Sequence, residues 1–280
     1  MDINTIRHIE RPSSAAQVTQ WRDGLAWLNG GTWLFSEPQP ALDTLIDLRA
    51  FHWPAFEITP EGLTIAATAR IGELDTLAYP STWTAGPLLS ECCRALLMSF
   101  KIAHEASIGG NICMSLPAGA MISLTVALEA TYTLWPRDGE PRTVAATDFV
   151  TGNHANVLAP GELLRSIHIP LHALEKRYAF RRSSLTHLGR SAALLVGTAG
   201  PDGDLLLTIT AATFTPVQLR FAPKPDATTV RRAIDAAIPQ DGYYDDVNGL
   251  PAYRRHLTYH FAEEIRAELA GELAGLGAGA

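Results

Sequence analysis

The chain contains 280 residues, of which 47% are hydrophobic and only 18% are charged. This composition is typical of a globular protein with a sizeable core, and it excludes intrinsic disorder and fibrous architectures. A net charge of −7 gives the chain no electrostatic reason to bind nucleic acid or anionic lipid. The N-terminal residues lack the apolar core of a signal peptide, and glycine and proline interrupt the longest uncharged segment, residues 106–128. We therefore expect a cytoplasmic protein with no membrane span.

The first part of the chain alternates short apolar runs with helical patterns. In chain order, we predict a buried strand ending in a glycine turn (26–31), a helix or turn followed by a strand (42–51), two strands joined around Pro60-Glu61-Gly62 (56–71), one helix with an inward face (87–102), a second, buried helix (120–128) and a strand (130–136).

The pattern changes near Pro170, where we place a domain boundary. Beyond it, we predict two strand regions followed by two helices (178–184, 204–221, 227–238 and 253–270). Strands followed by helices, without strict alternation, indicate an α+β fold. The chain is thus predicted to have a larger domain over 1–170 and a smaller one over 171–280.

Two glycine-rich segments in the first domain are the main candidates for a binding site. One is Asn29-Gly30-Gly31-Thr32, directly after an apolar strand, and the other is Ser107-Ile108-Gly109-Gly110-Asn111. Paired glycines let the backbone turn sharply and bring its N–H groups close to a phosphate. Neither segment matches the Rossmann or Walker pattern, and composition alone favours ordinary tight turns.

The cysteines and histidines do not indicate a metal site. Cys92 and Cys93 are adjacent and Cys113 is the third, whereas an iron–sulfur cluster normally takes four cysteine ligands at defined spacing. We expect three reduced, mostly buried thiols. His256 and His260 are interpreted as surface or interface residues. No G-x-S-x-G elbow occurs, so a serine hydrolase is not indicated, and no catalytic residue is predicted.

Taken in chain order, several segments resemble one family. They are GGTWL, LIDLR, GLTIAATARIGEL, ASIGGNICMSLPAG, GELLRSIHIP, FRRSS and DVNGLPAYRRHL, spread over about residues 10–270. They look like the FAD-binding (medium) subunit of the molybdenum hydroxylases, the flavin component of xanthine dehydrogenase and carbon monoxide dehydrogenase. The resemblance implies a two-lobed FAD-binding domain of the vanillyl-alcohol-oxidase/PCMH type. A small α+β C-terminal domain of the carbon monoxide dehydrogenase flavoprotein type would follow.

The resemblance also implies a set of FAD-binding residues. The first glycine segment would hold the pyrophosphate, chiefly through backbone amides, and the second would line the flavin. A leucine would pack near the isoalloxazine ring, and Arg181, with Arg182 as its competitor, would approach the polar edge of the ring. The implied residues are Leu28, Asn29, Gly30, Gly31, Thr32, Trp33 and Leu34, then Ser107, Gly110, Asn111 and Cys113, and Leu163 or Leu164.

The chain departs from the family pattern at several side chains. Trp33 stands where relatives usually carry Asp, Ser or Glu, and Met114, Leu116 and Ala120 replace polar residues of the family's N-A-S-P-x-x-D. Backbone-mediated pyrophosphate binding does not need these side chains, so we expect FAD to bind and its redox tuning to differ. Restoring a carboxylate with Ala120→Asp is expected to shift the flavin potential and leave occupancy nearly unchanged.

The resemblance implies partner chains, because this chain lacks iron–sulfur ligands and is too short for a molybdopterin domain as well. They would be a large molybdopterin subunit and a small iron–sulfur subunit, in a dimer of heterotrimers. Electrons would pass from the iron–sulfur clusters through FAD to an external acceptor. Two alternatives stay open, namely a stand-alone FAD oxidoreductase of the same superfamily and a scaffold subunit that has lost FAD.

Overall fold

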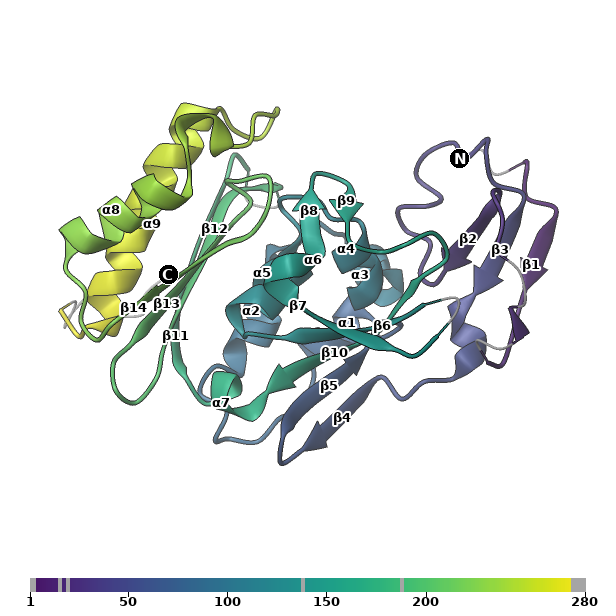
Figure 1. Ribbon diagram of the computed structural model, residues 1–280, viewed down its shortest axis with the longest axis horizontal. Coiled ribbons are helices and arrows are strands. Elements are labelled where there is room, and N and C mark those ends of the chain that lie inside the picture. The colour runs from purple at the N-terminus through teal and green to yellow at the C-terminus, as the bar shows by residue number, and fades with distance from the viewer. Residues whose placement is uncertain (1–3, 15–16, 19–20, 137–138, 187–188, 273–280) are drawn as a thin grey trace.

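The computed structural model describes residues 4–14, 17–18, 21–136, 139–186 and 189–272. Three units lie in a row, as Figure 1 shows: a small N-terminal sheet, a central sheet covered by helices, and a C-terminal sheet with two long helices outside it. Mixed sheets and helices without strict alternation confirm the α+β class. The described part of the chain contains no helix long and apolar enough to span a membrane.

The N-terminal sheet consists of three parallel strands in the order β1 (His8–Glu10), β3 (Thr44–Asp47), β2 (Leu25–Leu28). The expected order within residues 42–51 was wrong, because the strand comes first and a 3-10 turn, η2 (Leu48–Phe51), follows it. The side chain of Asp47 accepts a hydrogen bond from the backbone N–H of Arg49 and so begins the turn. Strand β2 confirms the strand predicted before the first glycine segment.

The central sheet is antiparallel, with the order β4 (Phe56–Thr59), β5 (Gly62–Ala66), β10 (Leu163–Pro170), β6 (Thr131–Trp135), β7 (Arg142–Ala145). The predicted pair of strands around Pro60-Glu61-Gly62 is confirmed. Gly62 has φ of +137°, and a Cβ atom there would lie 2.1 Å from the carbonyl oxygen of Ile169. Only glycine therefore fits this turn.

Helices and a small hairpin cover one face of the central sheet (Figure 1). They are α1 (Ile71–Asp75), α2 (Pro87–Ala95), α3 (Phe100–Glu105), α4 (Ile108–Cys113), α5 (Ala120–Ala127) and α6 (Ala146–Phe149), with the hairpin β8 (Val150–Gly152) and β9 (Ala155–Asn156). Every residue of α5 is buried, as predicted. Because its whole circumference is apolar or small, α5 can lie between two sheets.

The single helix predicted over 87–102 is two helices. Helix α2 ends at Ala95, Leu96 is extended, and the hydroxyl of Ser99 then accepts a hydrogen bond from the N–H of Ile102 to begin α3. The inward face is confirmed for α2, whose leucines and cysteines are buried. It is wrong beyond the break, since the side chain of Phe100 is 73% exposed.

The C-terminal sheet is an antiparallel meander of β11 (Arg177–Ser184), β12 (Ser191–Ala199), β13 (Leu205–Thr210) and β14 (Val217–Phe221). The short helix α7 (Leu171–Leu174) connects it to the central sheet, and η3 (Gln240–Gly242) lies between α8 (Ala227–Ala237) and α9 (Pro251–Leu269). Strand β12 was not predicted. The domain boundary at residue 170 stays a prediction.

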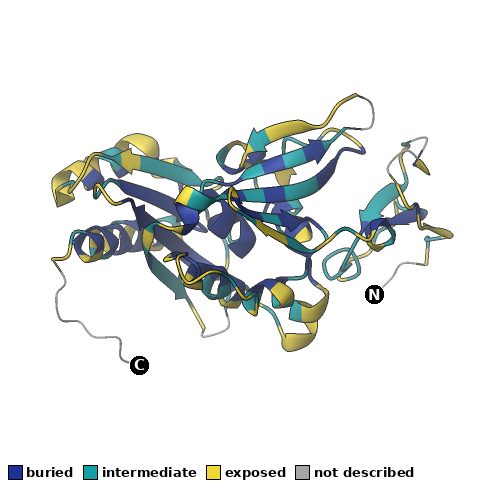
Figure 2. Cartoon of the chain, turned by 90° about the horizontal axis from the view of Figure 1, so that it is seen from below, coloured by how far each residue is buried: buried dark blue, intermediate teal, exposed yellow. Residues whose placement is uncertain are grey.

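Strand β12 separates two cores. Leu194 and Val196 pack with α5 and the central sheet, whereas Ala193 and Leu195 pack with α8 and α9. Figure 2 shows buried residues along these strands and on the helix faces between the sheets. The C-terminal sheet therefore shares its inner face with the central unit and covers its outer face with its own two helices.

Candidate functional site

The first glycine segment begins where β2 ends. The side-chain amide of Asn29 donates a hydrogen bond of 3.1 Å to the carbonyl oxygen of Thr68, which fixes the start of the turn. A Cβ atom on Gly30 would lie 1.8 Å from the carbonyl oxygen of Glu105. Gly31 has φ of +67°, and a Cβ atom there would meet the ring of Phe35 at 2.5 Å. The first glycine thus permits a close approach and the second a left-handed conformation.

The second glycine segment is the first turn of a helix rather than the tight turn that composition alone favours. Ser107 precedes α4, and its hydroxyl accepts a hydrogen bond of 3.1 Å from the N–H of Gly110. A Cβ atom on Gly109 would lie 2.5 Å from that of Ala67, so this glycine lets α4 pack directly on the chain that leaves β5. A Cβ atom on Gly110 would lie 2.7 Å from the hydroxyl of Ser107.

The two segments lie side by side, although 77 residues separate Gly30 from Ser107 in the numbering. Gly30 rests on the backbone of Glu105 and Ala106, immediately before Ser107. The β8–β9 hairpin also joins them, because the ring of Trp33 lies 5.7 Å from that of His154 and the N–H of His154 donates to the carbonyl oxygen of Ser115. The two glycine segments identified by resemblance therefore lie together in the fold; that they form a cofactor site stays a prediction.

The backbone N–H groups of the two segments differ in whether they have hydrogen-bond acceptors within the chain. In the second segment, the N–H groups of Ile108, Gly109, Gly110 and Asn111 have acceptors at Ala69, Ala67 and Ser107. In the first segment, the N–H groups of residues 30–34 donate to no group in the described part of the chain, and these residues are half-buried. Backbone donors without an acceptor in the chain are available to water or to a bound group. Five successive free N–H groups fit an anionic group such as a diphosphate.

Asn111, expected to line the flavin, has a structural role that the sequence did not reveal. Its side-chain oxygen accepts a hydrogen bond of 3.0 Å from the N–H of Met121 in the first turn of α5. Gly119, which precedes α5, has no side chain for this task. Asn111 thus couples α4 to α5. Its role toward a cofactor, like those of Ser107 and Gly110, stays a prediction.

Trp33 and Ala120, two residues that depart from the family pattern, differ in their surroundings. Trp33 lies over the β8–β9 hairpin, as described above, whereas Ala120 is fully buried in the first turn of α5. A carboxylate at position 120 would therefore be removed from water within the core. The expected effect of Ala120→Asp on the flavin potential and on occupancy stays a prediction, and the burial of Ala120 adds an expected cost in stability.

The three cysteines are unsuited to act as thiolates. Burial raises the pKa of the Cys93 thiol and that of the Cys113 thiol to about 12, and it also raises the pKa of the Cys92 thiol well above its ordinary value. The carbonyl oxygen of Cys113 accepts a hydrogen bond of 2.9 Å from Asn156, which ties the second segment to the hairpin. Among the residues that the structure describes, no three His, Cys, Asp or Glu side chains form a group that could hold a metal ion.

Leu163 and Leu164 point to opposite sides of β10. Leu164 lies in the main core beneath the helices, whereas Leu163 packs with Leu48 and Phe51. Trp27, Trp53 and Trp135 complete this second cluster, which joins the N-terminal sheet to the central sheet. Both leucines are buried, and which of them would lie near a flavin ring stays a prediction.

Arg181 and Arg182 also lie on opposite faces, here of β11. Arg181 faces α9, where its guanidinium donates to Glu264 at 2.8 Å and Glu268 at 2.6 Å. Arg182 pairs in register with Leu194 on the inner face and donates to the hydroxyl of Ser191 at 2.8 Å. Burial lowers the pKa of Arg182. The charge of Arg181 is thus engaged with α9, whereas Arg182 lies on the inner face of the sheet; which of the two would approach a flavin ring stays a prediction.

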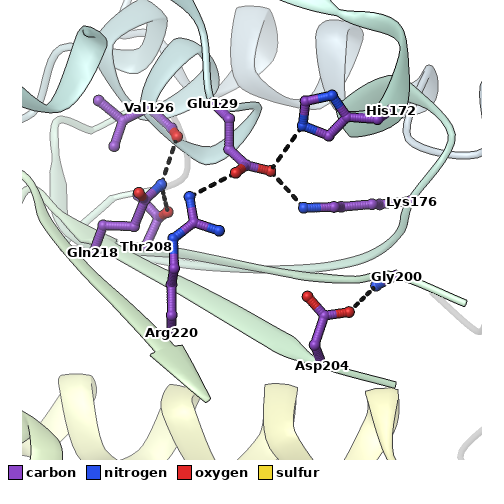
Figure 3. A network of polar contacts seen from close by, with 9 residues as sticks. All are labelled: Val126, Glu129, His172, Lys176, Gly200, Asp204, Thr208, Gln218 and Arg220. Carbon is purple, nitrogen blue, oxygen red and sulfur yellow. Dashed lines mark hydrogen bonds and ion pairs between the residues drawn. The ribbon is translucent and has the colours of Figure 1, made fainter. Parts of the chain in front are cut away.

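A polar network fixes the C-terminal sheet against α5 (Figure 3). Glu129, which follows α5, accepts hydrogen bonds from Lys176 and, at 2.6 Å, from Arg220, while His172 lies 3.7 Å away. Gln218 adds a hydrogen bond of 2.8 Å to the carbonyl oxygen of Val126. These contacts tie the end of α5 to β14 and to the residue before β11, beside the core that the two units share.

The sequence matches a known family over residues 6–172, described as the FAD binding domain in molybdopterin dehydrogenase. It is 27% identical over 150 residues to the carbon monoxide dehydrogenase medium chain of Hydrogenophaga pseudoflava, covering 53% of this chain and 49% of that protein. It is 34% identical over 179 residues to the medium chain of Afipia carboxidovorans, covering 61% of each. The matched segments thus span about half to three-fifths of these relatives.

Solved structures show the same fold over nearly the whole chain. Carbon monoxide dehydrogenase from Hydrogenophaga pseudoflava aligns with a TM-score of 0.79 and 19% identity, covering 95% of this chain and 98% of that one. Quinoline 2-oxidoreductase from Pseudomonas putida 86 aligns with a TM-score of 0.73 and 18% identity, covering 97% and 98%. These alignments include the C-terminal sheet and its helices, beyond residues 6–172 that match the family.

Proposed function

Since the chain belongs to the family of FAD-binding domains of molybdopterin dehydrogenases, we propose that it is the flavoprotein subunit of a molybdenum-containing hydroxylase or dehydrogenase. In this role it receives electrons from the iron–sulfur clusters of a partner subunit and passes them through FAD to an external acceptor. The observation that supports FAD binding most directly is the row of free, half-buried N–H groups at residues 30–34, beside Ser107.

In this proposal, the residues of this chain bind FAD and orient it. The free N–H groups hold the diphosphate, Gly30 keeps the two segments in contact, and Trp33 covers the turn from the side of the hairpin. Arg182 supplies a positive charge from the inner face of β11. Bound FAD supplies the redox chemistry, because a flavin can accept electrons singly and pass them on as a pair. No residue of the chain is assigned as a catalytic acid or base.

The iron–sulfur and molybdenum centres belong to partner chains in this proposal. Cys92 and Cys93 are buried in α2, and Cys113 lies at the end of α4, so the three thiols do not converge as a cluster site would require. The partners are a large molybdopterin subunit and a small iron–sulfur subunit, assembled as a dimer of heterotrimers.

The test is a flavin count on the purified chain and on its complex. FAD released by denaturation should be close to one per chain, and the native complex should contain iron, molybdenum and two further kinds of chain. A chain that folds but binds no FAD, even when FAD is added during refolding, would instead be a scaffold. A chain that turns over a substrate with FAD and no partner would be a stand-alone oxidoreductase.

A further inference from the structure

The β8–β9 hairpin is anchored by hydrogen bonds to the end of α4, the helix that begins at the second glycine segment. The N–H of His154 donates at 3.0 Å to the carbonyl oxygen of Ser115. The side-chain amide of Asn156 donates at 2.9 Å to the carbonyl oxygen of Cys113 and at 3.0 Å to the hydroxyl of Ser115. Ser115 is fully buried, and its own hydroxyl donates at 3.2 Å to the carbonyl oxygen of Ile112. The hairpin therefore has a fixed place beside the second glycine segment.

Two residues of this anchor have a left-handed backbone conformation. Ser115 has φ of +51° and His154 has φ of +56°, and these two residues are bonded directly to each other. Residues other than glycine seldom adopt this conformation, and they keep it where surrounding contacts fix it. His154 is exposed, so its ring contributes little to the core. The backbone at the tip of the hairpin is thus defined by its bond to Ser115 and not by core packing.

The ring of His154 contacts the first glycine segment. Its centroid lies 5.7 Å from that of Trp33, with an angle of 44° between the ring planes. Aromatic rings attract each other at this distance. Trp33 belongs to the row of residues 30–34, whose N–H groups donate to no group in the described part of the chain. The row begins at the contact of Gly30 with Glu105, and the ring pair fixes the middle of the row to the hairpin.

Support from the hairpin matters because the row does not fix itself. Donors hold an anion well when they are already in place before the anion arrives. The N–H groups of residues 30–34 cannot supply this order, since none of them is bonded to another group that the structure describes. The hairpin supplies it through Trp33. Asp, Ser or Glu, which the family pattern usually has at position 33, offers no ring for such a contact, so this support is a property of the tryptophan.

We infer that Trp33 and His154 are positioning residues that slow the dissociation of FAD. This inference rests on the proposed function, in which residues 30–34 bind the diphosphate. With both rings in place, the hairpin keeps the donors in their arrangement, and FAD leaves when the ring contact opens. Without either ring, the middle of the row moves more freely and the cofactor is released faster. The pair acts on retention of the cofactor and not on its redox reaction.

The experiment measures how fast bound FAD exchanges with an excess of isotope-labelled FAD, on the full chain together with any subunits that co-purify with it. His154→Asn removes one ring and keeps a residue type that tolerates a left-handed backbone. Trp33→Ala removes the other ring. Each variant should raise the dissociation rate of FAD about three- to tenfold, the range that the loss of an aromatic pair supports. The double variant should be no faster than the faster single variant, because both substitutions remove the same contact.

His52→Asn is the matched control. His52 is also an exposed histidine with a left-handed backbone, φ of +53°, and it makes no ring contact among the described residues. Its replacement should leave the dissociation rate of FAD unchanged, and it should shift the urea midpoint about as much as His154→Asn does. Trp33→Phe keeps a ring opposite His154, so its dissociation rate should stay within about twofold of the wild-type rate.

The outcomes separate this inference from the proposed function. If the wild-type chain binds no FAD, the proposed function fails and this inference with it. If wild type retains FAD and the variants without a ring release it at the wild-type rate, only the inference is overturned. It is also overturned if the effects of Trp33→Ala and His154→Asn add in full, since the two rings then act separately. An equal acceleration by His52→Asn would overturn it as well, because the ring contact would not be the cause.

Discussion

The carbonyl oxygen of Glu105 occupies the space that a side chain on Gly30 would need, since the two sites would be 1.8 Å apart. This contact joins the end of β2 to the chain that leads into α4. At this contact, two segments that are distant in sequence meet. Backbone atoms rather than side chains make the contact. A methyl group there cannot be accommodated by a rotamer change.

Gly30→Ala should therefore reduce both stability and FAD retention. Separating the two segments is expected to cost about 1–3 kcal/mol in the free energy of unfolding and to lower the flavin-to-protein ratio severalfold. Urea unfolding and flavin absorbance measure the two effects. Gly152→Ala is the control, because a Cβ atom at Gly152 would meet its nearest neighbour at an ordinary 3.7 Å. Equal behaviour of the two variants would contradict the close contact.

Ala120→Asp should destabilise the fold. The side chain of Ala120 is fully buried, so the new carboxylate would lose its water without gaining a cationic partner. We expect a loss of roughly 3 kcal/mol or more in the free energy of unfolding, measured by urea denaturation. Ala252→Asp is a matched control, because Ala252 is also in the first turn of a helix, α9, but is exposed. A small and equal effect at both positions would show that residue 120 faces a polar cavity.

Glu129→Gln should loosen the C-terminal sheet from α5. Burial of Glu129 opposes its ionisation, but hydrogen bonds from Lys176 and Arg220 outweigh this and lower its pKa. The stability from this ionised group is present above the unfolded-state pKa of about 4.3 and is lost as the pH falls through the lower folded-state pKa. The variant should be about 1–3 kcal/mol less stable than wild type at pH 7.

This difference between wild type and Glu129→Gln should shrink as the pH is lowered below about 4, because the wild-type carboxyl then becomes protonated. Urea unfolding at a series of pH values gives the profile. Glu57→Gln is the control, since Glu57 is exposed and makes no ion pair within the described residues. A difference that persists unchanged at low pH would mean that the charge of Glu129 is not what holds the sheet.

The elements that the sequence predicted correctly are those with local causes. The β4–β5 hairpin follows from Gly62, and α5 follows from a run of apolar and small residues without a charge. Strand β12 was missed because all nine of its residues are buried between two cores, so polar and apolar side chains do not alternate. The break after α2 was missed because Leu97 and Phe100 continue the apolar spacing of a helix past its end.

The candidate site likewise has some features that the sequence could predict and others that it could not. The two glycine segments could be found from their motifs, but their contact depends on residues 30 and 105, which no local pattern connects. The capping of Met121 by Asn111 and the contact of Trp33 with His154 likewise join different elements. The sequence could not distinguish Arg181 from Arg182, because it does not show which face of β11 packs against α9. Contacts between distant residues, not propensities, decide these roles.

Opposite faces of β11 lead to opposite expectations for its two arginines. Arg182→Gln should lower the affinity for FAD severalfold or shift the flavin potential, because it removes the positive charge on the inner face. Its effect on the free energy of unfolding should be small, since Arg182 pairs with no carboxylate in the described part of the chain.

Arg181→Gln should have the opposite effects, namely a small loss of stability and no change in FAD affinity or flavin potential. It leaves Glu264 and Glu268 on α9 without their shared cation, and because both carboxylates are partly exposed the loss of stability should be below about 1 kcal/mol. That loss should decrease further at high salt, where the repulsion between the two carboxylates is screened. FAD affinity and potential should match wild type, as a redox titration beside an equilibrium binding measurement would show. If Arg181→Gln shifts the potential and Arg182→Gln does not, the flavin ring is approached from the α9 side, and the preference for Arg181 is supported.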